Sequence, residues 1–257
     1  MLKKTLMTGA VVAALVAPSF AFADDTPPYS VTTNVGLFSQ YLFRGVEQTF
    51  GAPALQGGAD LTTAAGFYLG TWGSNISWLQ DAGAYNAGGG LEWDLYGGYR
   101  GSIGASGLGY DVGLIQYQYI GKHAGAPTAN TTEFHAGVSY SVLSFTVYYN
   151  LFNYFGVADS DGTIYYNLAA AIPLASTGLT ANLHAGHTAV AGTGHGSLNY
   201  NDFSAGVSYA LGSYTFGGMY SYAKGKDGSL GVFTLPGDDG NRQQGLSQWV
   251  VSVSRSF

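Results

Sequence analysis

The stretch Leu91-Glu92-Trp93-Asp94-Leu95-Tyr96-Gly97-Gly98-Tyr99-Arg100 decides the fold class. Its odd positions are mostly apolar, whereas Glu92, Asp94 and Arg100 occupy even positions. A β-strand sends alternate side chains to opposite faces, so the stretch predicts a strand with one apolar and one charged face. In a transmembrane β-barrel the apolar face meets lipid and the charged face lines a wet lumen.

The same period-two pattern recurs along the rest of the chain and predicts twelve antiparallel strands, an even number as bacterial single-chain barrels require. Between residues 115 and 119 the alternation is blurred, which indicates either a β-bulge or a buried cluster in the lumen. The predicted strands are residues 31–46, 54–61, 66–75, 90–100, 108–120, 131–140, 144–153, 163–172, 179–187, 201–210, 214–222 and 247–257.

The links between these segments alternate in length after the first one, residues 47–53, which is intermediate. The short links are residues 62–65, 101–107, 141–143, 173–178 and 211–213, and longer links separate them. Outer-membrane barrels have short periplasmic turns and longer extracellular loops. The pattern therefore predicts an up-and-down barrel with both termini in the periplasm.

Composition supports a barrel in lipid over a soluble protein. Charged residues make up 9% of the chain, against about 25% in soluble domains. Aromatic residues reach 15%, led by 20 tyrosines, and cysteine is absent, so no disulfide braces the fold. The low charge argues against a soluble surface and the acidic balance argues against nucleic-acid binding.

Residues 1–23 read as a cleaved signal peptide. Lys3 and Lys4 form a basic start, an apolar run follows, and Ala21-Phe22-Ala23 matches a small-x-small cleavage site. Cleavage before Asp24 changes the formal net charge from −6 to −8. Residues 24–257 are then expected to form a single outer-membrane β-barrel domain.

The C-terminal segment predicts an assembly signal. Trp249, Val251, Val253 and Phe257 occupy alternate positions and end on a terminal aromatic residue. Such a strand resembles the signal that the outer-membrane barrel-assembly machinery reads. Arg255 departs from this pattern, but an Arg near the interface can extend its charge to lipid headgroups.

Several stretches of the chain resemble the TorF-type porin family, also called the Gcw_chp family of proteobacterial proteins. The resemblance covers most of the mature chain and is densest in residues 34–120. It implies an outer-membrane barrel with a porin role, and it supplies no solute and no catalytic residue. The stretches that carry it are residues 39–46 (SQYLFRGV), 53–58 (PALQGG), 66–75 (GFYLGTWGSN), 92–99 (EWDLYGGY) and 110–113 (YDVG).

Seven charged residues are expected to face the lumen. Arg44 shares a strand face with Gln40 and Leu42, and a lone cation on the lipid face would cost about 2–4 kcal/mol near the midplane. Arg44 should therefore point inward, either as a constriction charge or as part of a bracing salt-bridge network. Its expected partners are Asp60, Glu92 or Asp94. The full set is Arg44, Asp60, Glu92, Asp94, Arg100, Asp111 and Glu133.

No catalytic, cofactor or metal site is predicted. Strand register places His135 and His184 on inner faces, away from a lipid-facing Ser/His pair. His184 and His187 fall on opposite faces, which disfavours a metal cluster. The Asp159-Ser160-Asp161-Gly162 turn lacks the later ligands of a calcium loop.

Three functions remain open at this point. The first is a porin-like outer-membrane channel for passive diffusion of small hydrophilic solutes, with a weak preference for cations because acids outnumber bases on the inner faces. The second is a plugged barrel with a structural or surface-binding role. The third is an integral outer-membrane lipid hydrolase. Expected partners are outer-membrane lipids, lipopolysaccharide, the barrel-assembly machinery and small solutes; the sequence does not predict an oligomeric state.

Overall fold

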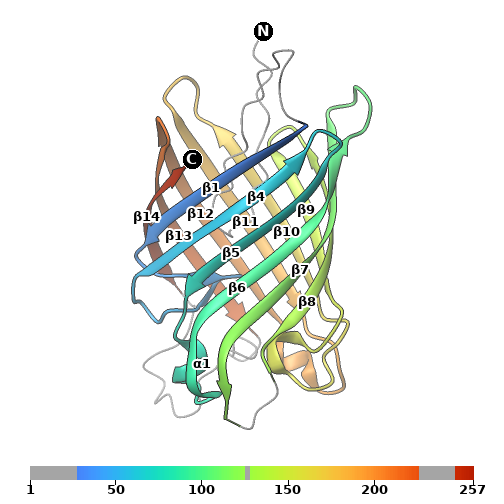
Figure 1. Ribbon diagram of the computed structural model, residues 1–257, viewed down its shortest axis with the longest axis vertical. Helices are drawn as coiled ribbons and strands as arrows, with labels where there is room; N and C mark the ends of the chain where they lie inside the picture. Colours follow the sequence, from blue (N-terminus) through green and yellow to red (C-terminus); the bar gives the residue numbers. More distant parts are fainter. Residues whose placement is uncertain (1–27, 125–127, 226–246) are drawn as a thin grey trace.

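The computed structural model describes residues 28–124, 128–225 and 247–257, and these form a closed antiparallel barrel of twelve strands (Figure 1). Each strand pairs with its neighbour in the chain, and β1 closes the barrel against β14. The barrel strands are β1 (Tyr29–Phe38), β4 (Ala54–Thr63), β5 (Phe67–Asn75), β6 (Tyr85–Ser102), β7 (Leu108–His123), β8 (Thr131–Tyr140), β9 (Leu143–Asn150), β10 (Ile164–Pro173), β11 (Leu179–Ala189), β12 (Tyr200–Leu211), β13 (Tyr214–Gly225) and β14 (Gln248–Ser256).

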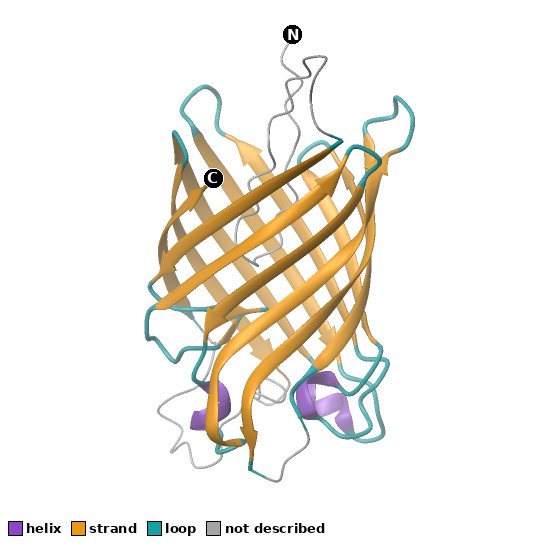
Figure 2. Ribbon diagram, viewed as in Figure 1, coloured by secondary structure: helices purple, strands orange, loops and turns teal. Residues whose placement is uncertain are grey.

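The two ends of the barrel differ. The start of β1, the end of β14 and all the short turns lie at one end, here called the turn end (Figure 1). The opposite loop end carries α1 (Trp78–Asp81), η1 (Tyr154–Gly156) and η2 (His195–Leu198), drawn as helices in Figure 2. None of the helices in the described ranges has the length and hydropathy of a membrane span.

The outer and inner faces of the wall follow the sequence alternation. On β6, Leu91, Trp93 and Leu95 are 46%, 44% and 43% exposed, whereas Glu92 and Asp94 between them are each 1% exposed. The same holds around the barrel, where large apolar side chains project outward from the strands. A broad exposed apolar surface on a closed barrel is the surface that a bilayer covers.

The predicted strands match the observed ones closely, with one exception. The expected strand over residues 31–46 is wrong beyond Phe38, where the chain leaves the wall. Residues 39–53 instead fold into the lumen, and they contain the short hairpin β2 (Leu42–Phe43) and β3 (Val46–Glu47). With the strand ended at Phe38, the first link is long, so short and long links alternate throughout.

The blurred alternation on β7 has a structural cause. Tyr117 and Tyr119 belong to a buried cluster inside the barrel, as one of the two alternatives predicted. Register shifts lie on the neighbouring strand β6, between Tyr85 and Ala87 and between Gly88 and Glu92. The expected signal peptide, residues 1–23, lies outside the described residues.

Candidate functional site

The inward loop, residues 39–53, is the feature that distinguishes this lumen from an empty barrel. Its tip is a two-residue turn, Arg44-Gly45, between the paired residues Phe43 and Val46. Both turn residues have positive φ, 50° for Arg44 and 78° for Gly45, as the tight turns of two-residue hairpins require. Glycine adopts this conformation freely, but an Arg held there costs about 1–3 kcal/mol. Other contacts must therefore hold Arg44 in place.

Hydrogen bonds fix the base of the inward loop to the wall. Ser39 N–H donates to the carbonyl of Val251, and Val251 N–H donates back to Ser39 Oγ, at 2.9 and 3.0 Å. The Gln40 amide donates to Gln248 Oε1 and to the Trp249 carbonyl, both at 3.0 Å. The first half of the loop is thus an extension of the β1–β14 seam that turns into the lumen.

Arg44 makes a bidentate ion pair with Glu133 of β8. Nη1 donates to Oε1 at 2.9 Å and Nη2 to Oε2 at 2.6 Å, with side chains 5% and 0% exposed. Burial by itself lowers the pKa of Arg44, but the Glu133 carboxylate more than offsets this and the pKa lies above its ordinary value. Arg44 therefore stays charged, and removing either partner would leave a buried charge uncompensated.

Aromatic rings surround the Arg44 guanidinium. Its Cζ lies 4.1 Å from the ring centroid of Tyr165, 4.7 Å from that of Phe43 and 5.2 Å from that of Tyr148. The Tyr117 hydroxyl also donates to Glu133 Oε2 at 3.1 Å and so fixes the carboxylate. Cation–π contacts of this kind are strongest where water is excluded, as it is here.

Close packing holds the rest of the inward loop. Phe43 packs edge-on against Tyr117 and Phe155, with centroids 5.7 and 5.5 Å away. The Tyr41 hydroxyl donates to Glu92 Oε1 at 3.2 Å, and burial raises the pKa of Tyr41 well above its ordinary value. At Gly45 there is no room for a side chain, because a Cβ there would lie 2.8 Å from the Asp202 Cβ.

The loop half of the lumen is filled around its whole circumference. Each of the twelve strands contributes at least one buried inward residue, and many of these residues belong to one packed cluster with the inward loop. The twelve are Gly36, Ala54, Trp72, Glu92, Tyr117, Glu133, Asn150, Tyr165, Thr188, Asp202, Ala223 and Val250.

The turn half of the lumen is polar and partly exposed. Asp111 accepts from the Tyr68 hydroxyl at 2.7 Å and lies 3.1 Å from His135 Nε2. Arg100 is exposed and donates to Thr62 Oγ1 at 3.0 Å. The lumen is therefore polar towards the turn end and packed around the inward loop towards the loop end.

The seven charges predicted to face the lumen lie in different settings. Arg44 is inward, yet the expected partners Asp60, Glu92 and Asp94 are wrong, because the chain turns at Arg44-Gly45 and carries the guanidinium across to Glu133. Glu92 and Asp94 are buried beneath the inward loop. Asp60, Arg100 and Asp111 line the turn half of the lumen.

Sequence reasoning missed Asp202, Tyr148 and Tyr165 of this site, and it placed Tyr117 only within the cluster expected over residues 115–119. Asp202 is inward and bonds His184 at 2.6 Å, and the alternation of its strand could have placed it there. Tyr117, Tyr148 and Tyr165 also lie on inner faces of their strands. No sequence signal marked them as neighbours of Arg44, because that contact depends on the path of the inward loop.

The histidines do not gather into one site. His135 and His184 each lie in the lumen beside an Asp and a Tyr, and His187 points outward and bonds Asn201 at 2.9 Å. Within the described ranges, no three acidic or His side chains are grouped as metal ligands would be. Asp159 and Gly162 both have positive φ in the turn where a calcium loop was disfavoured.

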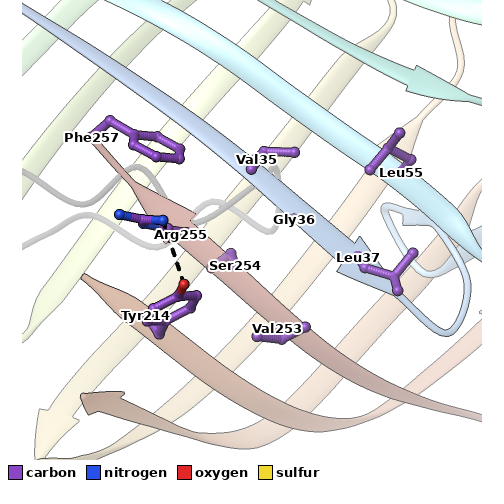
Figure 3. A pocket seen from close by; sticks show the side chains of 9 residues that line it. All are labelled: Val35, Gly36, Leu37, Leu55, Tyr214, Val253, Ser254, Arg255 and Phe257. Atoms are coloured by element: carbon purple, nitrogen blue, oxygen red, sulfur yellow. Dashed lines mark hydrogen bonds between the residues drawn. The ribbon is translucent and has the colours of Figure 1, made fainter. Parts of the chain in front are cut away.

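The outer wall carries a shallow apolar groove at the seam between β1 and β14 (Figure 3). Val35, Leu37 and Leu55 border it, with Val253 on the neighbouring strand. Arg255 lies at its edge, 4.5 Å from the Phe257 ring centroid and within 3.5 Å of the Tyr214 hydroxyl. The groove faces outward and is separate from the lumen.

The fold has relatives among solved structures. The chain superposes on the KdgM porin with a TM-score of 0.50 and 10% identity, covering 88% of this chain and 99% of that one. The NanC porin gives 0.51 and 10%, covering 89% and 99%. At this identity the likeness concerns the barrel fold alone. No curated protein matches the sequence significantly.

A family profile gives the stronger relationship. The profile described as "Bacterial protein of unknown function (Gcw_chp)" matches residues 22–257, which is nearly the whole chain. The match spans the barrel and the inward loop together. The chain therefore belongs to the Gcw_chp family of bacterial proteins of unknown function.

Proposed function

We propose that this protein is a channel in the bacterial outer membrane for passive diffusion of small hydrophilic solutes, with the inward loop as its gate. The observation that carries the proposal is the two-part lumen. A polar, charged turn half of the lumen meets a packed loop half, in which the inward loop lies among Trp78, Tyr154, Phe155 and other side chains of the loop end. A barrel built only for structure has no need of a charged inner face, because an apolar packed core is cheaper to bury.

Location and orientation belong to the same proposal. The apolar outer wall needs a bilayer, and short turns are periplasmic in outer-membrane barrels. Both termini then lie in the periplasm and the inward loop closes the extracellular side. Trp249, Val251 and Phe257 point outward at the C-terminal strand, 71%, 64% and 63% exposed, as an assembly signal on a lipid-facing strand would.

A weak cation preference is also proposed. The inner faces of the described strands carry six acids, and Arg100 is their one arginine. Asp60, Glu92 and Asp94 have no Lys or Arg within ion-pair distance among the described residues. Unpaired acids along a pore attract cations. The six acids are Asp60, Glu92, Asp94, Asp111, Glu133 and Asp202.

The alternative is a permanently plugged barrel with a structural or surface-binding role. The buried Arg44–Glu133 pair supports it, because a tightly held plug resists opening. A lipid hydrolase has less support, since it would need a Ser/His pair facing lipid. His135 and His184 lie in the lumen, and the outward His187 bonds Asn201 rather than a serine.

Single-channel recording in planar bilayers tests the gate. Glu133→Gln removes the charge that compensates Arg44, so the inward loop should leave the lumen more often and the open probability should rise at least about tenfold. Asp111→Asn is the matched control, because Asp111 is a lumen acid that does not contact the loop. If Glu133→Gln stays as closed as the wild type, the permanently plugged barrel is the better account.

A further inference from the structure

The residues around the Arg44 guanidinium come from two places, the barrel wall and the inward loop. Glu133, Tyr148 and Tyr165 come from three adjacent strands, β8, β9 and β10, and the inward loop supplies only Phe43 and Arg44 itself. These three wall residues are called the guanidinium cage. Withdrawal of the loop would leave the cage in place, because its members belong to the paired sheet.

Hydrogen bonds between residues of the barrel wall hold the cage in place without any contribution from Arg44. The Tyr117 hydroxyl orients Glu133. The Tyr165 hydroxyl donates to Asp202 Oδ1 at 3.1 Å and lies 3.1 Å from His184 Nε2. The Glu133 carboxylate and the Tyr165 ring, both held by other wall residues, form a site that matches a planar cation with parallel N–H donors.

The chemistry of the cage selects guanidinium over ammonium. Glu133 accepts two parallel hydrogen bonds, at 2.9 and 2.6 Å, which only a fork of two nitrogens can donate. The Tyr165 ring lies 4.1 Å from the carbon of the guanidinium, where a flat cation stacks well. An ammonium ion has one charged nitrogen and cannot make both oxygen contacts in this way.

We propose that the guanidinium cage is a binding site for the guanidinium group of a small solute, and that Arg44 occupies it as a tethered ligand. This rests on the channel function proposed above and names a class of solute for it. A solute with a guanidinium group competes with Arg44, and its binding leaves the inward loop without its main polar anchor. A tethered group has an effective concentration of about millimolar, so the resting state is the closed one.

Binding to the refolded full chain in detergent micelles tests the cage directly. Arg44→Gly empties it, and glycine tolerates the positive φ of that turn position. Isothermal titration should show methylguanidinium binding to this variant about tenfold more tightly than methylammonium, and little binding to the wild type. The double variant Arg44→Gly with Glu133→Gln should lose the methylguanidinium binding.

Several results of this titration would contradict the proposal. The proposal fails if Arg44→Gly binds neither cation, binds both equally, or keeps its affinity after Glu133→Gln. It also fails if the wild type binds methylguanidinium as tightly as Arg44→Gly does.

A second variant covers the case in which Arg44→Gly does not fold. In Gly45→Ala the new Cβ would lie 2.8 and 2.9 Å from the Cβ atoms of Asp202 and Ala223, so the tip must move while the cage stays intact. Gly45→Ala should also gain methylguanidinium binding, and its failure to do so would overturn the proposal. Because binding is read without conductance, an absence of current would refute the channel and leave the cage standing.

Discussion

At the scale of single residues, Arg44 unites the contacts that hold the inward loop. It adopts a strained backbone conformation, carries a buried charge, and makes its strongest contacts across the lumen. The backbone strain and the buried charge are each unfavourable alone, and they are tolerated only because Glu133 lies opposite. The sequence predicted that Arg44 points inward, because a cation facing lipid is too costly. It could not predict the partner, since the turn at Gly45 moves the side chain to the other side of the barrel.

The packing of Phe43 leads to a prediction about what holds the inward loop inside the lumen. Phe43 is 4% exposed against two aromatic rings, and replacing such a buried Phe by Ala costs about 3–5 kcal/mol. Phe43→Ala should therefore release the loop and expose the Arg44–Gly45 bond to trypsin. Mass spectrometry of that cleavage, in protein folded in vesicles, measures the release.

Phe67→Ala is the matched control for this change. Phe67 is 60% exposed on the outer wall, and its ring partner there is Tyr99. Trypsin should cut this variant after Arg44 no faster than it cuts the wild type. Equal cleavage of Phe43→Ala and the wild type would mean that the loop is held by other contacts.

At the scale of elements, eleven of the twelve barrel strands could be placed from alternation alone. Strand β8 agrees at both ends with residues 131–140, because polar and apolar residues alternate there without interruption. The first strand was extended wrongly, since Tyr41 and Phe43 continue the alternation inside a hairpin. Side chains of an extended segment alternate with a period of two whether the segment lies in the barrel wall or inside the lumen. The predicted link over residues 47–53 was intermediate in length, unlike the clearly short or long links that follow. That was the available signal that the first strand ends earlier.

Strand β14 gives a prediction about register. Val251 is 64% exposed on the outer wall and Ser252 is its inward neighbour. Val251→Arg should lower the free energy of unfolding in lipid by about 2–4 kcal/mol if the site lies near the midplane, and Ser252→Arg should cost much less. Urea titrations of both variants in lipid vesicles measure the difference, and equal costs would refute the outward position of Val251.

At the scale of the whole molecule, the proposed channel combines an acidic lumen with a removable closure. Once the inward loop is out, the buried acids Glu92, Asp94 and Glu133 are expected to line the open lumen. Their field extends about 10 Å at 0.1 M salt and less at higher salt. The open channel should therefore prefer cations, and the preference should fade as salt rises.

Reversal potentials in a KCl gradient check this selectivity. In a barrel whose inward loop has been replaced, Glu92→Gln together with Asp94→Asn should reduce the preference for K⁺. The control is Lys122→Gln, because Lys122 is exposed at the loop end. An anion-selective current would contradict the expected role of the acids.

Replacement of the inward loop itself tests the central claim most directly. Residues 40–52 are exchanged for a short Gly/Ser linker, which keeps β1 and β4 joined and leaves the barrel wall unchanged. Single-channel recording then compares this barrel with the wild type in the same bilayer. A gate formed by the loop predicts steady conductance from the shortened protein and rare openings from the wild type. Equal conductance of the two, or none from a correctly folded shortened barrel, would contradict it.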